Sequence, residues 1–312
     1  MAYMKLPADL PPRLVAGPFS TADAERLGVQ RQRTRAGDLI SPTNGVRLPA
    51  GVAEDVKSRA HAYAIAAPNA VVSHTTAALL WGFPLPSSVE SDDVIHLSFG
   101  GGGRGCRRRG AKGHQVRLRP ADTVQGRLFT ATSPERTWVD LASLLSLDDL
   151  IITGDYLVRR RNPLSTIDAL RSQVGQMADR KGIVSSREAL GWVRARTDSA
   201  KETELRLLLV RAGLPEPSIN VAILDELDQW VQDPDMSYQD LRIAMQYDGG
   251  HHITEMQRRS DILRDDRAAE LDWLVLKYSQ LDLNRLGNGE PSAVTKTRRA
   301  LLGRGWTRNS VA

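Results

Sequence analysis

The chain has 312 residues, 41% hydrophobic and 25% charged, which is ordinary for a folded protein and long enough for two or three domains. Its single cysteine, Cys106, excludes an intramolecular disulfide, and it has neither a signal-peptide pattern nor an apolar run near the roughly 20 residues that span a bilayer, so we expect a cytoplasmic protein. The net charge of +5 is uneven: residues 199–312 carry −3 (15 Lys and Arg against 18 Asp and Glu) and residues 1–198 therefore +8, which predicts DNA rather than a membrane as partner.

The N-terminal segment has the pattern of a small DNA-binding module. A first helix is predicted by GPFSTADAERLGV (17–29), which begins with a Ser-Thr cap and ends at a glycine. A second, Arg-studded helix is predicted by QRQRTRAGDLI (30–40), and a hairpin with an Asn-Gly turn by SPTNGVRLP (41–49). This order is the outline of a winged helix-turn-helix domain over residues 1–51.

Arginines in this module are suited to phosphate and guanine contacts. The alternative is a small packing domain with a solvated basic helix. The residues expected to bind DNA are Arg31, Arg33, Arg35 and Arg47.

The middle of the chain continues with a helix, a strand and a basic loop. The helix is predicted by VVSHTTAALLWGFPLP (71–86), capped at Ser73 and ended at Gly82, and we interpret His74 in its first turn as structural. VIHLSF (94–99) predicts a strand, and residues 100–119 predict a Gly-rich flexible loop.

This loop has seven Lys and Arg between residues 104 and 119 and no acidic residue. Such a run of like charges predicts a nucleic-acid contact that becomes ordered on binding, with a solvated loop as the alternative. The residues expected to bind DNA here are Arg104, Arg107, Arg108, Arg109 and Lys112.

Residues 17–170 resemble the AbiEi-type antitoxins of type IV toxin–antitoxin systems. The resemblance is carried by the winged-helix start, by VVSHTTAALLWGFPLP and by TATSPERTWVDLA (130–142). It implies a DNA-binding autoregulator with a cognate toxin as partner, and a basic middle domain and connector over residues 52–198.

The C-terminal third alternates helices and strands. KETELRLLLVRAGLPEP (201–217) predicts a helix that ends at a glycine and a proline. LRIAMQY (241–247) alternates with a period of two and predicts a strand, from which Gln246 and Asp248 project on one face. A charged helix followed by a short strand is predicted by RRSDILRDDRAAELDWLVLKYS (258–279).

Acidic and amide side chains gather around the strand in MQYDGGHH (245–252). Asp235 and Asp248 could supply carboxylates to Mg²⁺ or Mn²⁺, and Gln246 a carbonyl oxygen. A histidine of the pair His251 and His252 could handle a proton near neutral pH. The alternative is a polar hairpin turned at Asp248-Gly249.

The segment from about 199 to 303 resembles the very-short-patch-repair-like branch of the PD-(D/E)XK nuclease superfamily. The resemblance implies an αββαβ core over residues 199–312, a divalent metal and a DNA repair context. It implies that Asp235, Asp248 and Gln246 are the metal ligands. It also implies that Glu202 positions metal or water and that His252 acts as an acid, a base or a phosphate partner. The family usually has Glu where this chain has Gln246, whose neutral amide can coordinate but cannot act as a base.

We therefore expect a mixed α/β (α+β) protein that binds DNA and hydrolyses phosphodiester bonds with Mg²⁺ or Mn²⁺. The first alternative is an antitoxin-like transcriptional regulator whose nuclease-fold domain is catalytically inactive. The second is a protein-binding module whose basic loop meets an acidic partner.

Overall fold

The computed structural model describes residues 7–101, 108–249, 255–285 and 289–307. The protein contains helices and mixed sheets, as expected for an α+β chain. It divides into two compact units, one made of residues up to 149 together with 169–187, the other of residues 150–168 and those from 188 on. No helix in the described ranges is long and apolar enough to cross a membrane.

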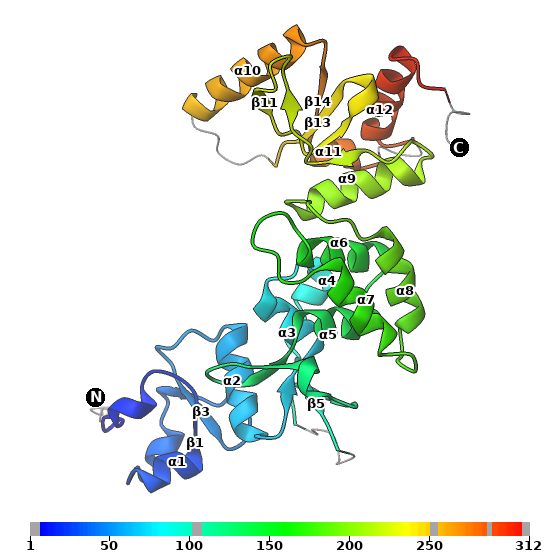
Figure 1. Cartoon of the computed structure of the whole chain (residues 1–312). Coiled ribbons are helices and arrows are strands. Elements are labelled where there is room, and N and C mark those ends of the chain that lie inside the picture. The colour runs from blue at the N-terminus through cyan, green and yellow to red at the C-terminus, as the bar shows by residue number, and fades with distance from the viewer. Residues whose placement is uncertain (1–6, 102–107, 250–254, 286–288, 308–312) are drawn as a thin grey trace. The chain divides into compact units, whose positions relative to one another are not determined.

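The first unit begins with a small sheet of strand order β1-β3-β2, in which all pairs are antiparallel (Figure 1). The predicted hairpin is confirmed as β2 and β3, whose connection contains Gly45 at a φ of 83° that favours glycine. The predicted cap is confirmed too, because Ser20 accepts a hydrogen bond from the Asp23 backbone N–H at the start of α1. The elements are η1 (Pro12–Leu14), β1 (Phe19–Ser20), α1 (Thr21–Arg26), η2 (Arg33–Arg35), β2 (Leu39–Ile40) and β3 (Val46–Pro49).

The predicted Arg-studded helix over 30–40 is wrong. Only the single 3₁₀ turn η2 forms there. Thr34 is the one buried residue of η2, so the segment has no apolar face that packing could use to stabilise an α-helix. The chain passes from this turn through residues 36–38 into β2.

A five-stranded sheet of order β6-β5-β4-β8-β7 forms the centre of the first unit. Helix α3 starts after Ser73 and ends before the left-handed Gly82, as predicted, although the Ser73 side chain makes no capping hydrogen bond. The helix packs against α2, α5 and strand β5. The elements are α2 (Val56–Ala66), β4 (Val71–Val72), α3 (His74–Trp81), α4 (Ser87–Glu90), β5 (Ile95–Phe99), β6 (Ala111–Gln115), η3 (Pro120–Asp122), β7 (Thr123–Gln125), β8 (Thr130–Thr132) and α5 (Pro134–Leu141).

The Gly-rich segment is not a loop along its whole length. Residues 111–115 form strand β6, which pairs in parallel with all of β5. The connector expected at the end of the region 52–198 is also largely helical. The helices from residue 147 to residue 192 are α6 (Leu147–Leu157), α7 (Ile167–Gly175) and α8 (Ile183–Trp192).

A buried polar network joins η3, α5 and α7 in the first unit. Asp122 is fully buried and accepts hydrogen bonds from Arg136 (2.8 Å), Arg119 (2.5 Å) and Gln173 (3.1 Å). Burial favours the neutral acid, but hydrogen bonds from Arg119 and Gln173 and the charge of Arg136 outweigh it and lower the pKa of Asp122 to about 2.

Residues 150–168 belong to the second unit because Asp155 on α6 is buried there. Its carboxylate accepts hydrogen bonds from Arg206 Nη2 and Thr203 Oγ1, both at 2.9 Å, and from the Arg194 backbone N–H at 2.7 Å. The expected boundary between residues 198 and 199 therefore falls inside a compact unit.

The second unit is built on a four-stranded sheet of order β14-β13-β12-β9. Strand β13 pairs antiparallel with β12 and parallel with β14, and β10 and β11 form a separate hairpin. The elements are α9 (Ala200–Arg211), β9 (Ser218–Ile219), β10 (Ile223–Leu224), β11 (Trp230–Gln232), β12 (Met236–Tyr238), η4 (Gln239–Leu241), β13 (Ile243–Tyr247), α10 (Glu255–Glu270), β14 (Leu274–Tyr278), α11 (Gln280–Leu283) and α12 (Ser292–Gly303).

Helices cover both faces of this sheet (Figure 1). Ile243 and Met245 pack in a core with residues of α9 and α12, whereas Ala244 packs with Ala268 of α10 on the other face. The predicted alternation of β13 is thus confirmed, although the strand starts at Ile243 because Arg242 is left-handed, with a φ of 49°. Gln246 shares the parity of Ala244 and lies on the α10 face.

The alternative of a polar hairpin at Asp248-Gly249 is wrong. Strand β13 pairs with β12 before it and with β14 after it, and α10 intervenes between β13 and β14. The parallel pairing of β13 and β14 requires such a crossover and excludes a two-residue turn.

Candidate functional site

A polar pocket of about 330 Å³ lies on the α10 face of the second sheet, where β13 ends. Three of the predicted site residues, Asp235, Gln246 and Asp248, are brought together in it. The pocket is lined by Asp235, Gln246, Tyr247, Asp248, Gly249, Asp261 and Lys277.

Strand register explains why these side chains meet. Met236 lies opposite Met245, so continuing the antiparallel register places Asp235 beside Gln246. On the other side, Gln246 is paired with Lys277 of β14. Residues opposite each other on neighbouring strands point to the same face, so an acid, an amide and an amine form a row across three strands.

Asp235 is the most perturbed group of the pocket. Its Oδ2 accepts a hydrogen bond from the Tyr247 backbone N–H at 2.6 Å. Burial, and then the negative charge of Glu202, raise the pKa of Asp235 to about 7. A cation beside this carboxylate would stabilise its charged form.

The Gln246 amide is oriented by a neighbouring amide. Its Nε2 donates to Gln232 Oε1 at 3.3 Å. Within the described residues nothing donates to Gln246 Oε1, and the buried Nε2 of Gln232 has no hydrogen-bond partner. Gln246 therefore has a carbonyl oxygen available to the pocket.

Two further pocket residues, Lys277 and Asp261, were not among the predicted site residues. Lys277 Nζ lies 2.5 Å from Asp265 of α10, and Asp261, one helical turn earlier, contacts Arg264 at 2.6 Å. The available signal was weak: a lysine inside the otherwise apolar LVLKY and two acids four residues apart in a charged helix. Only the parallel pairing of β14 reveals their place.

Glu202 does not line the pocket. It is the third residue of α9, 5% exposed, and its Oε2 accepts from the Asp198 backbone N–H at 2.9 Å and from Asn220 at 3.3 Å. The Ser199 hydroxyl in turn accepts from the Glu202 N–H and so caps the helix. Burial raises the pKa of Glu202. Its link to the pocket is its charge, which acts on Asp235.

Asp248 is exposed at the pocket rim, and its backbone N–H donates to the Tyr278 carbonyl at 2.6 Å, which extends the ladder with β14 beyond Tyr247. His251 and His252 lie outside the described residues.

Two of the four N-terminal arginines expected to bind DNA are engaged within the chain. Arg33 makes a two-pronged contact with Asp38 at 2.7 and 2.8 Å, and Arg47 donates to the carbonyls of Thr34 and Val46. Both side chains therefore brace the small sheet, whereas Arg31 and Arg35 are exposed.

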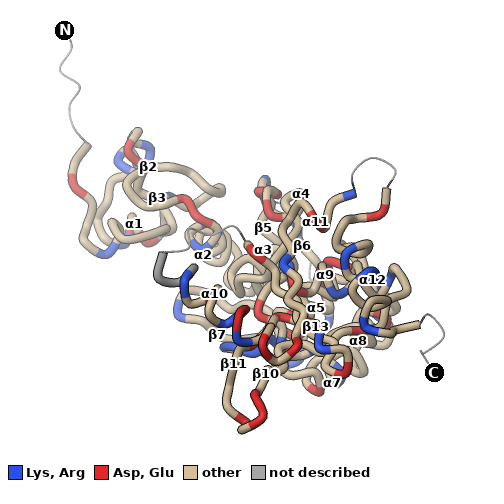
Figure 2. Tube along the Cα trace, turned by 90° about the horizontal axis from the view of Figure 1, so that it is seen from above, with Lys and Arg blue, Asp and Glu red and all other residues tan. Residues whose placement is uncertain are grey.

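The basic segment divides in the same way. Arg108 donates to the carbonyls of Asn44 and Ala66 at 2.9 and 2.8 Å, whereas Arg109 and Lys112 are exposed. Arg104 and Arg107 lie outside the described residues. Figure 2 shows basic and acidic positions interspersed along the chain.

A second cluster, of histidines in the first unit, was also missed. His74, His96 and His114 come from α3, β5 and β6 and meet with ring nitrogens within 4.8 Å of one another. Burial is the largest cause that lowers the pKa of His74 to about 2, and the neighbouring histidines lower it further. Burial is also the largest cause that lowers the pKa of His96 and of His114, each to about 4. All three rings are therefore neutral at physiological pH.

Comparison with known proteins identifies relatives without an assigned activity. No family model matches the chain, and no solved structure matches it. It is 29% identical over 221 residues to uncharacterized protein Rv2248 of Mycobacterium tuberculosis strain ATCC 25618 / H37Rv and to uncharacterized protein MT2308 of strain CDC 1551 / Oshkosh. The match covers 70% of this chain and 77% of each relative.

Proposed function

We propose that the protein binds DNA and hydrolyses phosphodiester bonds with Mg²⁺ or Mn²⁺ held in the pocket at the end of β13. The observation that carries the proposal is the row of Asp235, Gln246 and Lys277 across three strands, with Asp248 at the rim. These polar side chains meet in one pocket, and together they suit one phosphate and one metal ion.

The donor set fits a hard divalent cation. Mg²⁺ is usually bound through one or two carboxylates together with substrate phosphate and water, and Asp235 and Asp248 supply two carboxylates. Gln246 adds a carbonyl oxygen. When bound, such an ion polarises a phosphate and lowers the pKa of a water molecule.

Lys277 is suited to hold the phosphate. Its exposed ammonium group lines the pocket and rests against Asp265, an ion pair with both side chains partly in solvent and hence weak. A phosphate entering the pocket can therefore compete for this cation and be positioned between Lys277 and the metal ligands.

The fold of the second unit supports the proposal. The succession α9, β12, β13, α10, β14 follows the αββαβ order of a PD-(D/E)XK-like core, to which β9 and the β10–β11 hairpin are added. In the first unit, α1 and the β2–β3 hairpin support a winged-helix relationship, although the second helix of that motif is replaced by η2. We assign DNA binding to this basic part of the chain, with Arg31, Arg35, Arg109 and Lys112 among its exposed cations.

One observation favours a second candidate function. The central position of the row holds the neutral Gln246, where the resembled nucleases usually have Glu. The sheet therefore contributes one charged ligand fewer than in those nucleases, and no base at that position. A protein of this kind can be a DNA-binding regulator, working with a cognate toxin or a repair partner, whose second unit no longer cleaves.

Cleavage of supercoiled plasmid by the purified full-length protein separates the two. We expect nicking that requires Mg²⁺ or Mn²⁺, stops with a chelator, and is lost in Asp235→Asn and Asp248→Asn. Asp240→Asn is the matched control, because this exposed acid on η4 lies outside the pocket. DNA binding, followed by gel shift, should be the same in all four proteins.

If the wild type shifts DNA but never nicks it with either metal, the protein is a DNA-binding regulator and not a nuclease. If it neither shifts nor nicks DNA, both candidate functions fail, and the remaining hypothesis is that the basic surface binds a protein partner.

A further inference from the structure

Ring nitrogens of three histidines in the first unit lie within 4.8 Å of one another. His114 Nε2 lies 3.1 Å from His96 Nδ1, and the ring of His114 is stacked on that of His74 with centroids 3.7 Å apart. The side chains come from positions 74, 96 and 114, so no local turn or helix brings them together. Imidazole nitrogens are the ligands of zinc and related transition metals.

The fold holds these rings from both sides. Strands β5 and β6 pair in parallel, with His96 opposite Lys112 and Ser98 opposite His114, so both histidines lie on one face of the pair. Helix α3 starts against them, since the Ser73 N–H donates to the His96 carbonyl at 3.0 Å. His74 itself has a left-handed φ of 51°, an uncommon conformation for a residue with a side chain.

Groups behind His74 are arranged to orient its ring. Its Nδ1 lies 2.9 Å from Ser73 Oγ and 3.9 Å from Asp140 Oδ2. Asp140 is buried, and within the described residues its Oδ2 has no hydrogen-bond partner. Metal-binding histidines commonly direct their second nitrogen at a carboxylate, which fixes the ring and strengthens the ligand. This arrangement leaves His74 Nε2 for a metal ion.

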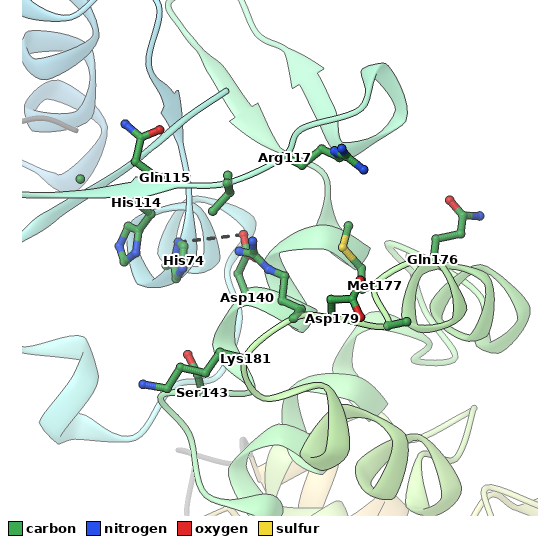
Figure 3. Close-up of a pocket in the computed structure, with 14 residues that line it drawn as sticks. His74, His114, Gln115, Arg117, Asp140, Ser143, Gln176, Met177, Asp179 and Lys181 are labelled. Carbon is green, nitrogen blue, oxygen red and sulfur yellow. Dashed lines mark hydrogen bonds and ion pairs between the residues drawn. The ribbon is translucent and has the colours of Figure 1, made fainter. Parts of the chain in front are cut away.

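The cluster opens into a pocket. His74 and His114 lie on the wall of a pocket of about 880 Å³, and Figure 3 shows the two rings side by side with Asp140 behind His74. Three basic residues, Arg117, Arg180 and Lys181, and two acidic residues, Asp140 and Asp179, line the same pocket. Arg180 contacts Asp140, and the pocket keeps one more basic than acidic residue, so it can admit a small anion.

We infer that His74, His96 and His114 bind a divalent transition-metal ion of the zinc type, with the remaining coordination position open to this pocket. Zinc–nitrogen bonds of about 2.0–2.1 Å place two ligand nitrogens roughly 3.4 Å apart, so separations of at most 4.8 Å contract by no more than about 1.4 Å through side-chain rotation. Three protein ligands and an open position are the pattern of catalytic rather than structural zinc, and the open position suits water or a small anion.

This site is separate in place and chemistry from the pocket proposed for Mg²⁺. That pocket offers oxygen ligands in the second unit, whereas the histidine cluster offers nitrogen ligands in the first. Failure of either proposal therefore leaves the other standing.

Zinc binding by the full-length protein, produced without a polyhistidine tag and stripped with a chelator, tests the inference. We expect one Zn²⁺ per chain in competition with a chromophoric chelator, and one Co²⁺ giving the visible bands of a tetrahedral, nitrogen-ligated ion. His96→Ala and His114→Ala should each weaken zinc binding at least 100-fold and abolish the Co²⁺ bands.

The remaining histidines provide matched controls. His61→Ala and the double variant His251→Ala, His252→Ala should bind zinc as the wild type does, and so should Asp235→Asn. Circular dichroism identifies any variant that fails to fold, and the half-buried His114, replaced by Gln, is the milder substitution. Absence of zinc binding by the wild type, or unchanged binding in a folded His114→Gln or His96→Ala, overturns the inference, as does loss of binding in the His251, His252 double variant alone.

Discussion

Replacing Asp235 by Asn should make the second unit more stable above neutral pH and abolish the Mg²⁺ binding that we propose. The carboxylate is half-buried, is held by the Tyr247 N–H, and has its pKa raised to about 7, first by burial and then by Glu202. An Asn oxygen can accept the same hydrogen bond without carrying a charge. The wild type therefore keeps an unfavourable charge that the variant lacks.

The magnitude follows from the two pKa values. Below the unfolded value of 3.8 the Asp235 carboxyl is protonated in both states and has no effect on stability. As pH rises from about 4 to 7, the unfolded chain ionises while the folded chain keeps its proton, so stability falls. Above pH 7 the whole cost is present, roughly 2–4 kcal/mol once solvent screening of a half-buried group is allowed for.

Amide hydrogen exchange in β13 measures this cost within the second unit itself, without assuming that the two units unfold together. At pH 8 we expect β13 amides to exchange roughly 30- to 900-fold more slowly in Asp235→Asn than in the wild type, which is 2–4 kcal/mol of opening free energy. At pH 5 the difference should shrink strongly. Mg²⁺ should slow exchange in the wild type and have no effect in the variant.

Asp240→Asn is the control for the charge change and should match the wild type at both pH values. Equal exchange of wild type and Asp235→Asn at pH 8 would refute the claim that Asp235 is a costly buried charge. Equal protection of both proteins by Mg²⁺ would refute its role as a ligand.

Three further outcomes are expected. Gln246→Glu should tighten Mg²⁺ binding, measured by calorimetry, and raise nicking, because it adds a charged ligand and the new carboxylate can accept a hydrogen bond from the Gln232 amide once that amide flips. No Mg²⁺ binding in either protein would refute the metal pocket. Arg109→Ala and Lys112→Ala should each reduce the salt slope of DNA binding by about one phosphate contact, whereas Arg108→Ala, which loses two carbonyl contacts, should lower thermal stability by about 1–2 kcal/mol and leave the slope unchanged. Asp122→Asn should lower stability at pH 7 by about 2 kcal/mol or more, a difference that disappears as acid titrates the wild type from pH 4 towards 2; an unchanged melting temperature would show that the buried network contributes nothing.

Local signals in the sequence were sufficient for the elements that depend on neighbouring residues. The cap at Ser20, the start of α3 after Ser73 and the alternation of Ile243, Ala244 and Met245 were all readable, because helix starts and strand parity involve residues only a few positions apart. Asp235, Gln246 and Asp248 could be nominated for the same reason, since each adjoins a recognisable strand.

The failures came where packing overrides local pattern. The basic stretch around Arg33 looked helical but had no apolar face to bury, so it folded as a single turn before β2. Glu202 was predicted to position metal or water, but it lies outside the pocket lining because its carboxylate accepts from backbone and amide donors that only the folded loop brings close. Its charge still acts on Asp235.

Tertiary structure alone decided which distant side chains share a site. Lys277 reaches Gln246 because β14 returns parallel to β13 after a helical crossover, and a pairing of that kind leaves no mark at either position in the sequence. His74, His96 and His114 follow no metal-binding spacing, since their separations are set by a helix packing on a strand pair rather than by one local element. Contacts between residues far apart in sequence depend on the whole packing arrangement, and chemistry built on them becomes visible only in the folded chain.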